Sequence, residues 1–306
     1  MRCRKCSQSA VINLKQHRIA LCKDHFNEWF LQHTATTIKK FHMINPGDRI
    51  LAAVSGGKDS LGLWDALTRL GYDVEGLSIQ LGIDSDNQYS TRSMEFTRKF
   101  AHKRGLLLHE LQIQQEYHET VPEMFIRSHP GDNKPCSTCG LVKRHELNRY
   151  ANENGFNVLA TGHNLDDEAA VLFSNNLTWN TDQLGRQYPV MEEREKFARR
   201  VKPFVQFYER ETTAYALLNE IEYIEDECPF STGSRTNHYK TILNELENDQ
   251  PGLKYQYFQT FIERKKTGLL KISESQLYEE KFCKQCGQPT SSADLCAFCR
   301  LVKSQN

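Results

Sequence analysis

The sequence predicts an α/β fold in which a doubly wound parallel sheet is flanked by a small metal-binding module at each end of the chain. Two observations predict it. Short apolar segments alternate with amphipathic ones from residue 49 to residue 177, which is the pattern of βαβ units with helices on both faces of the sheet. Closely spaced cysteine pairs occur near both ends of the chain, with the spacing of zinc knuckles.

The expected elements follow one another along the core. Residues 49–54 and 74–81 are predicted strands, and the helix between them, 60–70, carries an apolar stripe that ends at Gly71. A helix over 28–42 and a turn at residues 45–48 precede the first strand. The other expected helices cover 89–103, 142–154, 165–177, about 208–224 and 236–246, and the other expected strands cover 106–113 and 157–161.

Composition excludes several classes of protein. Charged residues make up 25% of the 306 residues, and no apolar run approaches the roughly 18 residues that a membrane-spanning helix needs. The basic start, Met1 to Cys6, lacks the apolar stretch of a secretory signal. We therefore expect a cytoplasmic protein without a membrane partner, in which ten cysteines serve metals or chemistry rather than disulfides.

The ten cysteines fall into a front, a central and a rear group. Two close pairs in the front group and two in the rear group would each close a tetrahedron around a structural zinc ion. The front ligands are Cys3, Cys6, Cys22 and His25, and the rear ligands are Cys283, Cys286, Cys296 and Cys299. The central group, Cys136, Cys139 and the distant Cys228, is one thiolate short. Zinc with a fourth ligand of another kind, a redox disulfide, an iron–sulfur cluster with one open iron, and unligated thiols all remain open for it.

A glycine-containing turn, Ser55 to Ser60, lies between the first predicted core strand and its helix. Its glycines let the backbone approach a ligand, and the amides at the helix N-terminus would face a phosphate. A Walker A loop is excluded because Ala52 and Asp59 stand where that loop needs Gly and Ser or Thr.

This turn, SGGKDS, resembles the pyrophosphatase loop (PP-loop) of ATP-dependent adenylating enzymes, whose nucleotide domain is of the adenine nucleotide alpha hydrolase type. A second junction, Ala160 to Ala169, resembles the GHNxDD element of tRNA-thiolating and lysidine-forming enzymes. The central CxxC with Lys143 behind it, the distant Cys228-Pro-Phe and the terminal modules are similar to the TtuA type of tRNA 2-thiouridine synthetase. That similarity runs from Cys3 to Leu301.

The resemblance implies an enzyme that uses ATP to adenylate the C2 carbonyl of a tRNA uridine, in the T-loop at position 54, and replaces its oxygen with sulfur. It implies a [4Fe-4S] cluster with one open iron on Cys136, Cys139 and Cys228, two zinc ions in the terminal modules, and magnesium. The implied catalytic residues are Lys143, Asp167 and Asp59. The implied ATP-binding residues are Ala53, Ser55, Gly56, Gly57, Lys58, Asp59, Ser60, Ile79, Gly162, His163 and Asp167.

The resemblance further implies a ubiquitin-like thiocarboxylate protein as sulfur donor and a homodimer. The domains expected from it are an N-terminal zinc finger over 1–27, a PP-loop domain over 28–225, a helical extension over 226–278 and a C-terminal zinc finger over 279–306.

A tRNA-binding chain with 39 basic and 39 acidic residues must distribute its charge unevenly. Residues 1–25 contain six basic residues and one acidic residue, and residues 264–303 contain eight and four. Residues 220–249 are strongly acidic. We therefore expect the two terminal modules to hold the tRNA.

Other functions remain open at this stage. A wobble-uridine thiolase is built from similar parts, and Lys143-Arg144 with the rear cysteine spacing favours the T-loop uridine only weakly. An ATP-dependent amidotransferase or sulfate-activating enzyme would share the loop, but the paired zinc modules argue against both. A zinc-ribbon tRNA-binding protein with a vestigial nucleotide site is the non-enzymatic alternative. Lys143 is also compatible with a solvated helix position, His163 with a buried structural one, and Asp166 or Asp167 with helix capping.

Overall fold

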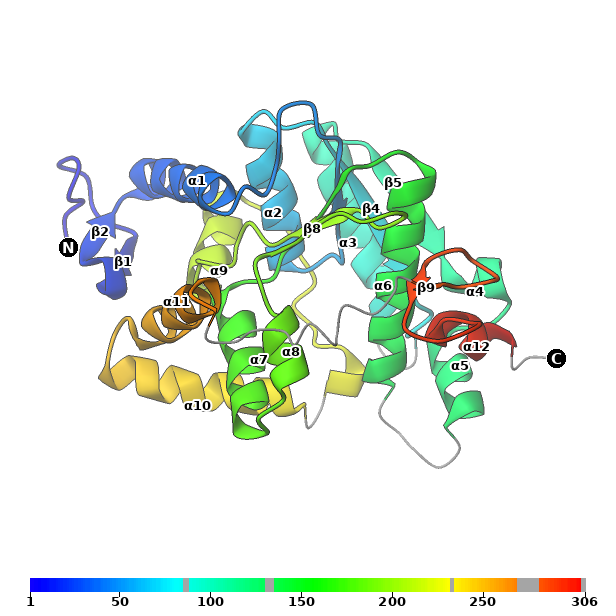
Figure 1. Cartoon of the computed structure of the whole chain (residues 1–306). Helices are drawn as coiled ribbons and strands as arrows, with labels where there is room; N and C mark the ends of the chain where they lie inside the picture. Colours follow the sequence, from blue (N-terminus) through cyan, green and yellow to red (C-terminus); the bar gives the residue numbers. More distant parts are fainter. Residues whose placement is uncertain (85–87, 130–134, 232–233, 269–280, 304–306) are drawn as a thin grey trace.

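The computed structural model describes residues 1–84, 88–129, 135–231, 234–268 and 281–303, and it is organised around one six-stranded sheet (Figure 1). The strand order is β5-β4-β3-β6-β8-β7. The bounds are β3 Ile50–Ala53, β4 Val74–Gln80, β5 Leu108–Gln112, β6 Val158–Thr161, β7 Val190–Met191 and β8 Arg199–Val201.

The predicted parallel sheet is confirmed for its central strands. β3 runs parallel to β4 on one side and to β6 on the other, so Ile50 lies level with Val74 and Val158. The edge strand β7 is antiparallel to β8, with Val190 opposite Val201, and the sequence pattern did not predict this strand pair. Only a short connection joins the two strands, and a short connection permits an antiparallel pair but not a parallel crossover.

The helices surround this sheet. They are α1 Lys23–Lys40, α2 Lys58–Arg69, α3 Tyr89–Arg104, α4 Ile113–Tyr117, α5 Val121–Ser128, α6 Cys136–Glu153, α7 Leu165–Leu177, α8 Thr181–Arg186, α9 Glu209–Leu218, α10 Arg235–Asp249, α11 Leu253–Lys266 and α12 Ala297–Lys303. The sequence pattern predicted α7 to the residue, but α4, α5, α8, α11 and α12 were not predicted.

Three predicted helix boundaries were wrong by five residues or more. α1 begins at Lys23 rather than at residue 28. α6 begins at Cys136 rather than at residue 142, with Pro135 at its N-cap. Its first turn, Cys-Ser-Thr-Cys-Gly, has no apolar stripe, so periodicity did not indicate a helix there. α9 ends at Leu218 rather than near residue 224, because the chain turns at Glu220, whose φ is +54°. The earlier start of α6 places both CxxC cysteines on the helix.

Buried side chains on the two faces of the sheet belong to two separate apolar clusters. On β3, Ile50 packs into one cluster and its neighbour Leu51 into the other, as the two-residue period of a strand requires. The first cluster joins the sheet to α1, α2 and α9, where the Phe30 ring stacks on Tyr215 at 4.1 Å between ring centroids. The second joins it to α5, α6 and the C-terminal module, including Phe298.

The terminal modules lie on opposite sides of the molecule (Figure 1). At the N-terminus, the antiparallel strands β1 (Ile12–Leu14) and β2 (Ile19–Leu21) lead directly into α1. At the C-terminus, β9 (Lys281–Phe282) and β10 (Pro289–Thr290) precede α12, which packs against α5 and α6. α10 and α11 of the expected helical extension pack against α7.

The proposed domain limits stay predictions. α1 begins at Lys23, inside the expected first module, and the expected limits at 278/279 and 306 lie outside the described residues. In the part of the chain that the structure describes, no helix is both long enough and apolar enough to cross a membrane.

Candidate functional site

The turn from Ser55 to Ser60 lies at the carboxyl end of β3 and is braced by its own side chains. Ser60 Oγ accepts the Ser55 backbone N–H at 3.1 Å and donates to the Gly57 carbonyl at 3.0 Å. Gly56 has φ +71°, and a Cβ at this position would lie 2.4 Å from the Ser93 carbonyl oxygen. Only glycine fits there, because an L residue would be strained and would collide with α3. The braced turn leads directly into α2, which begins at Lys58, and its Ser55 lines a pocket.

That pocket gathers residues that are far apart in the sequence. Ala53, Ser55, Ile79 and Lys143, all predicted site residues, line it together. The sequence did not indicate its other wall, because that wall is made where α3 and α6 pack over β4. The additional lining residues include Leu77, Ser78, Tyr89, Ser93 and Met94. An apolar cleft with a few polar groups at the carboxyl ends of parallel strands is suited to a nucleotide.

The second predicted loop packs directly on the first. A Cβ on Gly162 would lie 2.8 Å from the Asp59 carbonyl oxygen, so the two turns touch through their backbones. His163 Nδ1 lies 2.9 Å from Thr161 Oγ1. Asn164 and Asp167 cap α7 reciprocally, each side chain accepting the other residue's backbone N–H at 3.1 Å. The capping role considered for Asp167 is therefore present in the structure.

Two lysines and three carboxylates form one charged network at this junction. Lys58 Nζ lies 2.7 Å from Asp59 Oδ2 and 3.0 Å from Glu209 Oε1. Lys240 Nζ, from α10, lies 2.6 Å from Asp167 Oδ1 and 3.1 Å from Glu209 Oε2. Burial opposes the charged form of Lys240, but these two carboxylates raise its pKa. Glu209 and Lys240 are site residues that the sequence did not reveal, since neither belongs to a motif.

Burial also acts on Asp59 in this network. It raises the pKa of the Asp59 carboxyl, and nearby Asp167 acts in the same direction, whereas Lys58 and Thr212 oppose the shift. The Thr212 hydroxyl donates to Asp59 Oδ1. The network therefore holds three carboxylates against two ammonium groups. Such oxygen-rich groups suit a divalent cation that accompanies phosphate.

Asp166 and Asp167 are adjacent, but the structure separates their roles. Asp166 is buried, pairs with Lys254 Nζ at 2.5 Å and accepts the Glu209 backbone N–H at 2.9 Å. Asp167 faces Lys240 and the charged network instead. Asp166 thus orients the start of α9, while Asp167 caps α7 and takes part in the charged network.

The three central cysteines meet at the start of α6. The Cys136 thiol donates to the Phe230 carbonyl at 3.5 Å, and Cys228 immediately precedes the short 3-10 helix η2, Pro229–Ser231. Burial and the neighbouring sulfurs of Cys228 and Cys136 raise the pKa of Cys139 to about 11, although Lys143 acts in the opposite direction. In the described part of the chain, these sulfurs do not form a group within 4.8 Å of one another as the terminal ligands do.

The N-terminal module does form such a compact group. The ligand atoms of Cys3, Cys6, Cys22 and His25 all lie within 4.8 Å of one another. Burial opposes the Cys3 thiolate, but backbone N–H groups of Cys22, Lys5 and Cys6 lower the pKa of Cys3 to about 6. Three sulfurs and one imidazole in this arrangement fit the donor set of a structural zinc ion.

The C-terminal module gathers its sulfurs against α6. Ligand atoms of Cys286, Cys296, Cys299 and His145 lie within 4.8 Å of one another. Cys283, the fourth predicted ligand, is not in this compact group, but its sulfur accepts the Cys296 backbone N–H at 3.2 Å. Burial opposes the Cys283 thiolate, but backbone N–H groups lower its pKa to about 6. Three thiolates with either Cys283 or His145 as the fourth donor fit structural zinc, and His145 is a donor that the sequence did not indicate.

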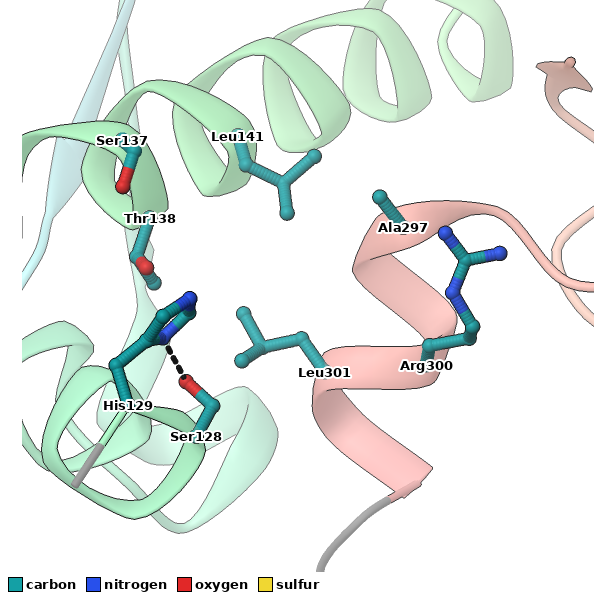
Figure 2. Close-up of a pocket in the computed structure, with 8 residues that line it drawn as sticks. All are labelled: Ser128, His129, Ser137, Thr138, Leu141, Ala297, Arg300 and Leu301. Carbon is teal, nitrogen blue, oxygen red and sulfur yellow. Dashed lines mark hydrogen bonds between the residues drawn. The ribbon is translucent and has the colours of Figure 1, made fainter. Parts of the chain in front are cut away.

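A second pocket lies where this module meets the core. Figure 2 shows its wall, made by the end of α5, the start of α6 and α12, with Leu141 and Leu301 pointing into it. Ser137 and Thr138, the two residues between the CxxC cysteines, line it as well. At its rim, Ser128 Oγ lies 2.8 Å from His129 Nδ1.

Comparison with known proteins decides the family. Residues 2–27 match the family described as 2-thiouridine synthetase TtuA, N-terminal LIM domain, and residues 48–216 match the tRNA methyl transferase HUP domain. The tRNA-5-methyluridine(54) 2-sulfurtransferase of Thermus thermophilus is 46% identical over 98% of this chain and 91% of its own length. The chain belongs to the TtuA family of tRNA sulfurtransferases. The family resemblance, the α/β fold and the enzymatic class predicted from the sequence are thereby confirmed.

Other relatives place the chain within this group of enzymes. The tRNA-5-methyluridine(54) 2-sulfurtransferase of Pyrococcus horikoshii is 41% identical over 98% of this chain and 93% of its own. Cytoplasmic tRNA 2-thiolation protein 1 of Chlamydomonas reinhardtii is 28% identical over 99% of this chain and 85% of its own. A solved structure, the U34-tRNA thiolase NcsA of Methanococcus maripaludis with its [4Fe-4S] cluster, superimposes with a TM-score of 0.81 at 25% identity, covering 99% of this chain and 96% of that one.

Proposed function

We propose that this TtuA-family enzyme uses ATP to adenylate the C2 carbonyl oxygen of uridine or 5-methyluridine 54 in the tRNA T-loop and then replaces that oxygen with sulfur. One observation carries the choice of nucleotide: relatives named for position 54 are 41% to 46% identical over nearly the whole chain. The U34-tRNA thiolase, which has the same fold, is 25% identical. The wobble uridine is therefore the second candidate.

The nucleotide pocket supports the first step. ATP would place its adenosine against Ala53 and Ile79 and its phosphates over the turn from Ser55 to Ser60, where backbone N–H groups stabilise negative charge. Lys58 begins α2 at that position, so its ammonium would help to neutralise the departing pyrophosphate. Adenylation converts a poor leaving oxygen into one that departs with AMP.

The charged network would bind magnesium with the nucleotide. Asp59, Asp167 and Glu209 converge from three elements, and carboxylate oxygens are the protein ligands that this ion prefers. Lys240 now bridges Asp167 and Glu209 at the position that suits a cation. Binding of nucleotide with its metal would therefore require Lys240 to exchange its carboxylate partners for phosphate oxygens.

The central cysteines would hold a [4Fe-4S] cluster with three thiolates. Their wider spacing, compared with the terminal groups, suits a multi-iron cluster better than a single ion, because each thiolate binds a different iron. When bound, the cluster would supply one iron without a protein thiolate, at which sulfur can be held. Lys143 lines the nucleotide pocket and is also close enough to Cys139 to lower its pKa, so it would stabilise negative charge between the two sites.

The remaining parts of the proposal rest on the family resemblance and on the charge pattern. We propose zinc in both terminal modules, which would hold the tRNA, a ubiquitin-like thiocarboxylate protein as sulfur donor, a homodimer and a cytoplasmic location. The exposed Arg2 and Arg4 in the N-terminal module support the tRNA contact, because neither side chain forms an ion pair or hydrogen bond with a described residue.

The direct test is thiolation by the anaerobically reconstituted enzyme with ATP, sulfide and unmodified tRNA. Mass spectrometry of nuclease fragments is expected to locate the new sulfur in the T-loop. Cys228→Ala should lose iron and activity, whereas Ser231→Ala, in the adjacent turn, should keep both. Sulfur found in the anticodon fragment would identify the wobble uridine, not position 54, as the substrate. A fully active Cys228→Ala variant would refute the cluster assignment.

A further inference from the structure

The C-terminal metal group includes one donor from outside the module. His145 lies in the middle of core helix α6, yet one of its ring nitrogens is within 4.8 Å of the sulfurs of Cys286, Cys296 and Cys299. Cys283, which bonds the Cys296 backbone N–H, is a fifth potential donor. Structural zinc takes four ligands, so this group together with Cys283 offers one donor more than the ion needs.

The His145 ring is oriented by a buried carboxylate. Its Nδ1 lies 2.7 Å from Oε1 of Glu146, a side chain with no exposed surface. Glu146 also accepts the Tyr117 hydroxyl at 2.7 Å and the Arg149 guanidinium at 2.6 Å. Because an ionised carboxylate accepts only, the His145 Nδ1 must donate to it, and in a neutral imidazole the lone pair is then on Nε2. Metal-bound imidazoles are usually held in this way by a carboxylate on the other nitrogen.

The Nε2 atom of His145 makes no hydrogen bond in the described part of the chain. It is also buried. Burying a polar nitrogen without a hydrogen bond is unfavourable, so a donor left in this state requires an explanation. One ring nitrogen of His145 lies close to three cysteine sulfurs, and Nδ1 is already bonded to Glu146. Nε2 is therefore the nitrogen that faces the sulfurs.

Packing holds the ring against the module. The ring of Phe298, which lies between Cys296 and Cys299 in the sequence, stacks on the His145 ring with centroids 3.7 Å apart and planes 11° apart. The Gln288 side-chain amide donates to the His145 carbonyl at 3.2 Å. The module and α6 are therefore joined on both sides of the histidine.

We propose that His145 is a fifth donor of the C-terminal metal centre, whose Nε2 binds the metal together with Cys286, Cys296 and Cys299 whenever Cys283 does not. The centre would then keep its metal after loss of the Cys283 thiolate and would tie the module to the helix that carries Cys136 and Cys139. This inference rests on the proposed zinc in the C-terminal module. Zinc analysis of the parent chain tests that proposed zinc separately. Two equivalents of zinc are expected, and a parent that holds only one would contradict the proposal of a second zinc site.

The test uses the full chain with His25→Cys, so that no imidazole is expected in the N-terminal group. In that background, Cys283→Ser should retain the second zinc, and X-ray absorption at the zinc edge should show imidazole scattering. Adding His145→Phe should abolish that scattering and accelerate zinc release to a chelator about tenfold. His109→Phe, which removes another partly buried core imidazole, is the matched control and should change neither readout.

Several results of this experiment would contradict the proposal. If Cys283→Ser loses the second zinc, shows no imidazole scattering, or releases zinc at the same rate with and without His145, the proposal is wrong. If the triple variant fails to fold, the test is made instead by cadmium-113 NMR on the Cys283→Ser single variant. His145→Phe added to that variant must shift the C-terminal resonance while the His25-containing group stays unchanged; an unshifted resonance overturns the proposal.

Discussion

The tight fit of Gly56 yields a quantitative prediction for Gly56→Ala. Its φ of +71° costs an L residue about 1 to 2 kcal/mol. The new Cβ would lie 2.4 Å from the Ser93 carbonyl oxygen, and real Cβ contacts begin near 3.0 Å, so the backbone must move by at least the difference, 0.6 Å. Overpacking of this kind costs about 1 to 3 kcal/mol. The stiffer unfolded chain returns about 0.4 to 1 kcal/mol, so the expected net loss is about 3 kcal/mol.

The adjacent glycine is a matched control. Gly57 has an ordinary φ of −87°, and a Cβ there would find only Ser55 Oγ, at 3.8 Å. Gly57→Ala should therefore change stability by about 0.5 kcal/mol or less. Gly162→Ala separates sterics from φ, because its Cβ would lie 2.8 Å from the Asp59 carbonyl oxygen without a left-handed backbone, and we expect an intermediate loss.

Urea unfolding of the metal-loaded chain, followed by circular dichroism, measures these differences. ATP turnover should also fall about a hundredfold in Gly56→Ala, since a displacement approaching 1 Å of a positioning loop has effects of that order. If Gly56→Ala and Gly57→Ala differ by less than about 0.5 kcal/mol, the steric reasoning fails.

Three further predictions address the rest of the chain. Burial, with neighbouring His17 and Lys40, lowers the pKa of His33 to about 4. The unfolded chain therefore gains this proton first, near pH 6.5, and stability falls as the pH drops below that value. Between pH 7.5 and 5 the parent should lose about 2 kcal/mol more than His33→Phe, and equal losses in denaturant titrations would contradict this. Lys240→Met removes the ammonium partner of Asp167 and leaves Glu209 with Lys58 alone, which should cost about 1 to 3 kcal/mol. Lys284→Met, from an exposed pair, should leave the unfolding midpoint nearly unchanged, and similar shifts of the two midpoints would refute the distinction. Arg2→Glu and Arg4→Glu should each weaken tRNA binding and flatten its salt dependence, with ATP binding unchanged; Lys5→Glu should do less because Glu28 already neutralises Lys5 at 2.9 Å, and filter binding that ranks Lys5→Glu first would refute the assignment.

Local chemistry explains why much of this protein was predictable. The alternation of apolar segments predicted the central strands and α7, because the side-chain periods of two and 3.6 residues can be recognised from neighbouring residues. The turn from Ser55 to Ser60 was recognisable because its glycines and hydroxyls act within six residues of chain. The front group of four potential metal ligands was likewise predictable, since two close pairs supply all four donors.

Tertiary packing decided which distant residues join the sequence motifs in the sites. Glu209 and Lys240 enter the charged network only because α9 and α10 meet the carboxyl ends of the strands. Tyr89 and Lys143 share a pocket because α3 and α6 close over β4. His145 faces the rear sulfurs only because α12 docks on α6. Sequence alone thus determined the motifs and the family, since each motif is complete within a short segment. The partners of the motifs depended on the fold, because contacts between distant segments leave no periodic or spaced signal in either one.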